Sequence, residues 1–288
     1  MRNWRHSTAA LAAILLLPLS AQAAGLLGPS ALRARHTALA PQLAQNPFGG
    51  PLVLQSEESA RRVDGEVFAV IDHPHAAVAK ALSDPAQWCE ILILHLNTKY
   101  CRSHDAAGAT RVDVRVGKKH PQAVHAATLL SFRWQPPQVR QDYVSVQMDA
   151  AEGPYDTSDY RLIAEAVPMD GGKTLLHMGY AFSYGGASSM AMTLYLNTIG
   201  RDKVGFTRAG ADYVGGMRGV AERNTMRYYM AIDAYLDSLV SPPGQQLEHR
   251  LRGWFDATER FPRQLREVDR DGYLRMKRQE VERQVRAS

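Results

Sequence analysis

The stretch Gly65–Leu92, "GEVFAVIDHPHAAVAKALSDPAQWCEIL", leads from a strand into two short helices and decides the fold. The side chains of residues 65–72 alternate in polarity, and many of them are β-branched or aromatic, which predicts a strand. Pro74 suits the first turn of a helix, and the apolar residues after it share one helical face. Asp84 followed by Pro85 is typical of an N-cap and first helical position, so a second short helix is expected.

Downstream, the pattern first predicts strands and then helices. Strand-like runs separated by Pro and Gly turn signals predict an antiparallel meander; they cover roughly residues 94–104, 110–118, 124–134, 141–148, 159–167 and 173–184. Helical spacing follows, first over Ala187–Ile199 and then over a long helix from Met217 to Val240. Pro242-Pro243-Gly244 ends that helix.

The N-terminus predicts export. Arg2 and Arg5 precede a short apolar run, and Ala21-Gln22-Ala23 fits a signal-peptidase site, so residues 1–23 are interpreted as a signal peptide. The expected product is a soluble periplasmic or secreted protein that begins near Ala24. Residues 24–51, rich in Ala, Gly and Pro, predict a mostly extended leader with one or two helical turns around Ala31–Leu39.

Charge argues against a nucleic-acid partner. The formal net charge of +5 falls to +3 once Arg2 and Arg5 are removed, and residues 245–288 carry 11 Lys/Arg against 8 Asp/Glu, a local +3. The rest of the mature chain is therefore near neutral, whereas a nucleic-acid site needs a basic patch. The interpretation of residues 241–288 is a charged, peripheral, helical extension, with transient attraction to anionic lipid as an alternative.

The order of strand, helix pair, meander and long helix resembles the START-like, or helix-grip, superfamily, which includes polyketide cyclase-like and lipid-binding proteins. The resemblance rests on the Gly65–Leu92 stretch and on "AERNTMRYYMAIDAYLDSL" in the closing helix, and it spans about residues 52–240. It implies an α+β fold in which a curved antiparallel sheet wraps around the long helix, and sheet and helix together enclose a cavity. The helix at 187–199 and the tail are departures from the simplest version of that fold.

Each predicted strand has one apolar, aromatic-rich face, as expected for a sheet that exposes its other face to solvent. Those faces would line either a solid core or a ligand cavity, and aromatic residues with polar tips suit a cavity lining. The expected lining residues are Leu96, Tyr100, Val114, Phe132, Trp134, Tyr160, Tyr180, Phe182, Tyr184, Asn224 and Tyr228. If Asn224 is buried, it needs hydrogen bonds from the protein or from a ligand.

Three functions are compatible with these patterns. The leading hypothesis is a protein that binds or carries a hydrophobic small molecule or lipid. In this hypothesis the 187–199 helix controls entry to the cavity or contacts a membrane. The second is a cyclase- or aromatase-like enzyme on the same scaffold, and the third is an envelope interaction module that docks through its basic tail. The chain carries no nucleophile elbow, zinc-protease motif, phosphate loop or dinucleotide fingerprint, so we expect no catalytic residue, metal or cofactor.

The only two cysteines, Cys89 and Cys101, lie at the junction between the second short helix and the strand after it. On one straight strand they would stand about 40 Å apart, but a disulfide needs Cα atoms within about 7 Å. A bond therefore requires a chain reversal near Leu92 to Leu96. An oxidising compartment favours pairing. The sequence alone leaves two alternatives, a Cys89–Cys101 disulfide or two free thiols.

Overall fold

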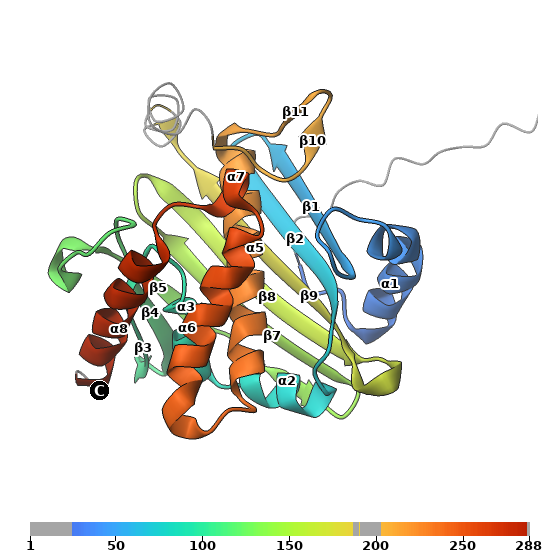
Figure 1. The fold of residues 1–288 in the computed structure, drawn as a ribbon, viewed down its shortest axis with the longest axis horizontal. Helices are drawn as coiled ribbons and strands as arrows, with labels where there is room; N and C mark the ends of the chain where they lie inside the picture. The colour runs from blue at the N-terminus through green and yellow to red at the C-terminus, as the bar shows by residue number, and fades with distance from the viewer. Residues whose placement is uncertain (1–24, 187–189, 191–202, 287–288) are drawn as a thin grey trace, which may run out of the picture.

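We describe the protein from a computed structural model that covers residues 25–186, 190 and 203–286. The predicted signal peptide and nearly all of the predicted 187–199 helix lie outside these residues. The fold is α+β: a large antiparallel sheet carries the long helix α5 (Gly216–Ser238) across one face, as Figure 1 shows. The predicted helix-grip fold class is therefore confirmed.

The stretch that decides the fold forms the expected elements. β2 (Arg62–Ile71) leads into α2 (His75–Leu82) and α3 (Pro85–Leu92). Asp84 caps α3, because its side chain accepts a hydrogen bond from the backbone N–H of Ala86 at 2.8 Å. Gly65 in β2 allows the close approach of α5, since a Cβ there would lie 2.4 Å from the Thr225 hydroxyl oxygen.

The main sheet contains nine strands in the described residues, in the order β1-β2-β9-β8-β7-β5-β4-β3, with β6 paired to β7. Every pairing is antiparallel. The remaining strands are β1 (Leu52–Ser59), β3 (Thr98–Ala106), β4 (Ala109–Val116), β5 (Thr128–Trp134), β6 (Gln138–Arg140), β7 (Tyr143–Glu152), β8 (Thr157–Pro168) and β9 (Thr174–Tyr184). A small hairpin, β10 (Arg208–Ala209) and β11 (Asp212–Tyr213), precedes α5. The meander prediction holds, but β1 was missed.

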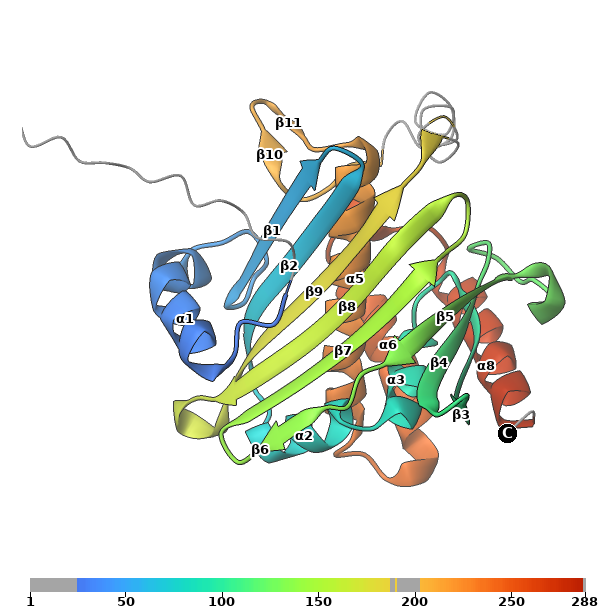
Figure 2. The same ribbon diagram turned by 180° about the vertical axis from the view of Figure 1, so that it is seen from behind.

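The predicted extended leader is wrong, because residues Pro29–Ala44 form the 16-residue helix α1. Figure 2 shows α1 against the face of the sheet opposite α5. Leu32, Leu39 and Leu43 are buried there in a second apolar cluster that includes Phe68 and Val167. The leader is thus part of the folded unit, and it covers one corner of a sheet face that is otherwise uncovered in Figure 2.

The prediction of a peripheral tail is also wrong. α6 (Pro243–Glu259) packs on α5, the short α7 (Pro262–Leu265) follows, and α8 (Arg270–Arg286) lies beside β3 (Figure 1). Trp254 and Tyr273 are buried in the main core and stack with ring centroids 5.0 Å apart. The Trp254 indole N–H donates to the backbone carbonyl of Arg227 at 3.0 Å. The tail is therefore rich in charged residues but buries one side against the rest of the domain.

Candidate functional site

An aromatic surface on the inner face of β8 and β9 forms the floor of the candidate site. Tyr160 of β8 stacks on Phe182 of β9 with ring centroids 5.4 Å apart and lies 6.1 Å from the ring of Tyr180. Phe132 of β5 meets Tyr160 edge-on at 6.4 Å. The Tyr160 hydroxyl hydrogen-bonds Thr157 at 2.8 Å. This surface is apolar in its body and carries hydroxyl groups at its edge.

Helix α5 faces this surface with a stripe that is not fully covered. Val220, Asn224 and Tyr228 follow a four-residue spacing, so they lie on one face of the helix. All three are partly exposed, although the residues on either side of each are mostly buried. The Tyr228 ring lies 5.3 Å from the ring of Tyr180, which places the stripe against the sheet. These three side chains are therefore less completely buried than their neighbours on α5.

His95 closes one end of the site. Its ring stacks on Tyr228 at 5.0 Å, and its Nε2 lies 3.3 Å from Oδ1 of Asn224. The backbone N–H of Asn97 donates to Nδ1 of His95 at 3.1 Å, so the proton of the neutral ring is on Nε2 and points to Asn224. Burial, helped by the charges of Arg227 and Lys277, holds the pKa of His95 well below its usual range. His95 is therefore a neutral, fixed donor.

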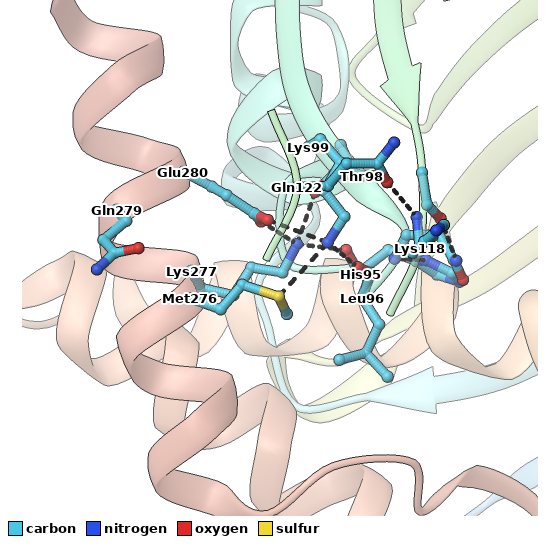
Figure 3. Close-up of polar contacts among 12 residues, drawn as sticks. His95, Leu96, Thr98, Lys99, Lys118, Gln122, Met276, Lys277, Gln279 and Glu280 are labelled. Carbon is cyan, nitrogen blue, oxygen red and sulfur yellow. Dashed lines mark hydrogen bonds and ion pairs between the residues drawn. The ribbon is translucent and has the colours of Figure 1, made fainter. Parts of the chain in front are cut away.

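The turn that carries His95 is held by α8 through a buried ion cluster, shown in Figure 3. The Lys277 ammonium donates to the carbonyls of His95 and Thr98 at 2.6 and 2.7 Å, and the Lys99 ammonium donates to Leu96 at 2.8 Å. Both ammonium groups contact Glu280, at 2.8 Å from Lys277 and 3.0 Å from Lys99. The tail thus positions one wall of the candidate site.

A disulfide closes the same region. Cys89 of α3 and Cys101 of β3 are bonded, with Cα atoms 5.2 Å apart. The chain reverses between them because residues 94–97 form a turn and not the start of a strand. That turn also corrects the strand predicted over residues 94–104, because β3 begins only at Thr98.

Positive charge surrounds the buried end of the site. Glu267 contacts Lys119 at 2.8 Å, Arg227 at 3.1 Å and Lys203 at 3.8 Å. Burial opposes ionisation of Glu267, but these cations outweigh it and lower the pKa of its carboxyl. Arg227 and Lys119 both act on His95 as neighbouring charges.

The structure brings most of the predicted lining residues together. Phe132, Tyr160, Tyr180, Phe182, Asn224 and Tyr228 meet at the site through the contacts given above. Leu96, Val114 and Trp134 are buried in the same core cluster, where Trp134 packs edge-on against Trp88 at 6.4 Å. Tyr184 lies towards the exposed end of β9, and its hydroxyl donates to Glu58 at 2.5 Å.

Tyr100 is a wrong prediction, because it pairs with Arg115 on the opposite face of the sheet. An irregularity between Thr98 and Tyr100 shifts the register, and Cys101 instead points inward opposite Val114. Val220 was not among the predicted lining residues, although helical spacing places it on the same side of the long helix as Asn224 and Tyr228.

Two other polar groupings lie away from this site. On the face covered by α1, His177 lies 2.8 Å from Glu165 and 3.1 Å from Glu66. Glu165 also accepts from the hydroxyl of Tyr143 at 2.7 Å and from the backbone N–H groups of Leu27 and Gly28 at 2.8 and 3.0 Å. Burial disfavours a charged His177, but the two carboxylates outweigh it and raise its pKa. This cluster fastens the start of α1 to the sheet.

The second grouping lies in a groove of about 240 Å³ between the end of β2 and the outer side of α5, lined in part by Tyr229 and Met230. His73 lies there, 3.7 Å from Asp233 and 3.3 Å from Asp237. Hydrogen bonds accepted by the carboxylates of Asp233 and Asp237 favour the protonated ring and raise the pKa of His73 to about 9. Within the described part of the chain, no three His, Cys, Asp or Glu side chains are grouped so as to hold a metal ion.

Comparisons with known proteins find likeness only at the level of solved structures. No protein-family model matches the chain, and no curated protein matches it. The chain is similar to norcoclaurine synthase from Thalictrum flavum at 12% identity, with a TM-score of 0.32 over 48% of this chain and 87% of that one. It is similar to Ara h 8.0201 at 9% identity, with a TM-score of 0.36 over 65% and 99% of the two chains.

A conserved protein of unknown function from Enterococcus faecalis matches at 7% identity, with a TM-score of 0.32 over 82% of this chain and 92% of that one. Likenesses this distant carry no information about a ligand or an activity.

Proposed function

We propose that this chain is an exported protein that binds or carries a hydrophobic small molecule or lipid between the inner face of the sheet and α5. One observation carries the proposal: Val220, Asn224 and Tyr228 are partly exposed along one side of α5, and that side meets the aromatic surface where Tyr228 lies against Tyr180. A solid core would bury such a stripe completely, whereas a ligand site leaves its lining accessible.

Export is supported by the predicted signal peptide and by the Cys89–Cys101 bond, since disulfides persist mainly in oxidising compartments. Across residues 25–186 and 203–286, none of the helices combines the length and the apolar character needed to cross a membrane. Contact of the 187–199 segment with a membrane stays a prediction. Fractionation of the host followed by N-terminal sequencing should find a processed chain that begins near Ala24; an unprocessed cytoplasmic chain would contradict export.

Native mass spectrometry of protein purified from its own host tests the binding proposal. We expect a bound apolar molecule that dissociates on activation. Val220→Trp should reduce the bound fraction, because the indole would fill the accessible space beside α5. The matched control is Val240→Trp, because Val240 lies two residues beyond the end of that helix and is 87% exposed. Equal occupancy in both variants would count against the site, and no bound molecule in the wild type, together with no binding of added lipids, would end the proposal.

The enzyme alternative is not favoured by the geometry. Both ring nitrogens of His95 are already engaged, one as acceptor from Asn97 and one as donor to Asn224, so neither is poised to take a proton from a substrate. The partner of His95 is an amide and not a carboxylate. The His–carboxylate pairs described above lie under α1 or in the outer groove.

The envelope-module alternative loses its original basis. It assumed a tail that could be removed from a folded domain, whereas α6 and α8 supply Trp254, Tyr273 and Lys277 to the core. Deleting residues 245–288 would expose that core, so loss of envelope association in such a variant would report unfolding. No specific observation favours a docking role over ligand binding.

A further inference from the structure

Two polar groups in the candidate site have hydrogen-bonding capacity that the described residues do not use. The Tyr228 hydroxyl takes part in none of the hydrogen bonds found there, although its ring is held by His95 and Tyr180. Asn224 uses its carbonyl oxygen towards His95, and its amide interacts with the hydroxyl of Tyr180. An amide has two N–H groups, so one is left to meet a ligand.

The polarity of Asn224 is fixed by its neighbour. Since Nδ1 of His95 accepts from Asn97, Nε2 must donate, and the Asn224 atom that faces it must be the carbonyl oxygen. The amide nitrogen therefore faces the aromatic surface. The site offers donors from Asn224 and Tyr228, one turn apart on the same helix face, and a ligand that fits them must bring an acceptor oxygen.

The surrounding charges favour an acceptor that is anionic. Arg227, Lys119 and Lys277 lie close enough to His95 to act on it as charges. Each of these cations is already engaged: Arg227 with Glu267 and the carbonyl of Leu265, Lys119 with Glu267, and Lys277 with Glu280 and two carbonyls. They supply a positive field without direct contact. A phosphate would require direct Arg or Lys contacts, whereas a carboxylate is satisfied by two neutral donors within such a field.

We propose that the ligand is a long-chain carboxylate, such as a fatty acid, whose head group accepts hydrogen bonds from Tyr228 and Asn224 while its chain lies along the aromatic surface of Tyr160 and Phe182. This inference rests on the proposed function, and it adds the head-group chemistry and the two residues that recognise it.

Displacement of a fluorescent apolar probe by a saturated fatty acid, and by the methyl ester of the same acid, tests the head group. The two molecules share the chain and the carbonyl, so their ratio isolates the charge. We expect the acid to bind about tenfold more tightly than the ester at neutral pH, as a hydrogen bond to a charged partner predicts. Equal affinities would overturn the carboxylate and leave apolar binding intact, whereas failure of both molecules to bind would overturn the proposed function as well.

Variants then test the residues. Tyr228→Phe keeps the ring and removes the donor, so it should weaken the acid about tenfold and the ester less, because the ester carbonyl loses only a neutral hydrogen bond. Tyr235→Phe is the matched control, because Tyr235 lies on the same helix and bonds Gln87 at 3.0 Å outside the site. Thermal melting of each variant verifies that it is folded. An unchanged acid-to-ester ratio in Tyr228→Phe would overturn the assignment, as would an equal loss in Tyr235→Phe.

Discussion

Replacement of Glu280 by glutamine tests whether the charged tail belongs to the core. Glu280, Lys99 and Lys277 are all fully buried, and the single carboxylate is 3.0 and 2.8 Å from the two ammonium groups. Glutamine keeps the shape and removes the charge, which leaves two buried cations without their counter-ion. Removing one partner of a buried ion pair costs about 3–5 kcal/mol. We expect about 3 kcal/mol, the lower end of that range, because both lysines keep backbone carbonyl acceptors.

The assay is urea unfolding followed by tryptophan fluorescence, with thermal melting in parallel. A loss of about 3 kcal/mol should lower Tm by roughly 6–12 °C in a chain of this size. Glu282→Gln is the control on the same helix, because Glu282 pairs with Arg286 in solvent. That exposed pair should be worth at most about 0.5 kcal/mol.

The effect of pH gives an independent check. Burial lowers the pKa of both Lys99 and Lys277 in the folded protein despite the attraction of Glu280. Without that carboxylate their folded-state pKa values fall further, so the unfolded chain binds more protons than the folded one, and stability rises with pH. The deficit of Glu280→Gln should therefore shrink between pH 7 and the usual lysine pKa of about 10.4. If the two glutamine variants were equally stable at pH 7, the reasoning would be refuted.

Three further predictions concern other parts of the fold. Cys89→Ala/Cys101→Ala should lose about 3 kcal/mol of stability, since the disulfide closes a loop with a sequence separation of 12; a reductant that leaves wild-type unfolding unchanged would contradict this. His73 has a pKa of about 9 in the folded protein, so its stabilising contribution is complete below about pH 6.5 and is lost as pH rises through about 9. That contribution is at most about 1 kcal/mol, because its carboxylate partners are partly solvated, and a His73→Gln variant whose pH profile matches the wild type would rule it out. Glu165→Gln should loosen α1 and accelerate tryptic cleavage within Pro29–Ala44, measured by limited proteolysis against the wild type; identical cleavage rates would show that this cluster does not hold the helix.

The fold class was predictable because its signals are local. Alternation of side chains, the Asp84-Pro85 cap and the change from strand to helix period all act over a few residues. The length of helix α1 was underestimated because Pro29 and Pro41 were taken as signs of extended chain, although Ala, Leu and Arg in this segment favour a helix. Packing of Leu32, Leu39 and Leu43 in one cluster with Phe68 stabilises it.

The tail was misjudged for a different reason. Lys277 and Glu280 are charged residues in the sequence, and only the three-dimensional proximity of Lys99, 181 residues from Glu280, makes their burial favourable. The state of His95 could not be predicted from the sequence for the same reason. Its neutral, donating state depends on Asn97 and Asn224, and the second of these is 129 residues away. Strand-face patterns predicted the aromatic surface correctly, since alternation alone places those residues on one side.

The most direct measurement of the ligand site is photo-crosslinking with a fatty acid that carries a diazirine in its chain, followed by peptide mapping. The site between sheet and helix predicts saturable labels on residues 180–184 and 220–228, and unlabelled fatty acid should compete them away. Labels confined to residues 48–52 and 229–237, which line the outer groove, would contradict it.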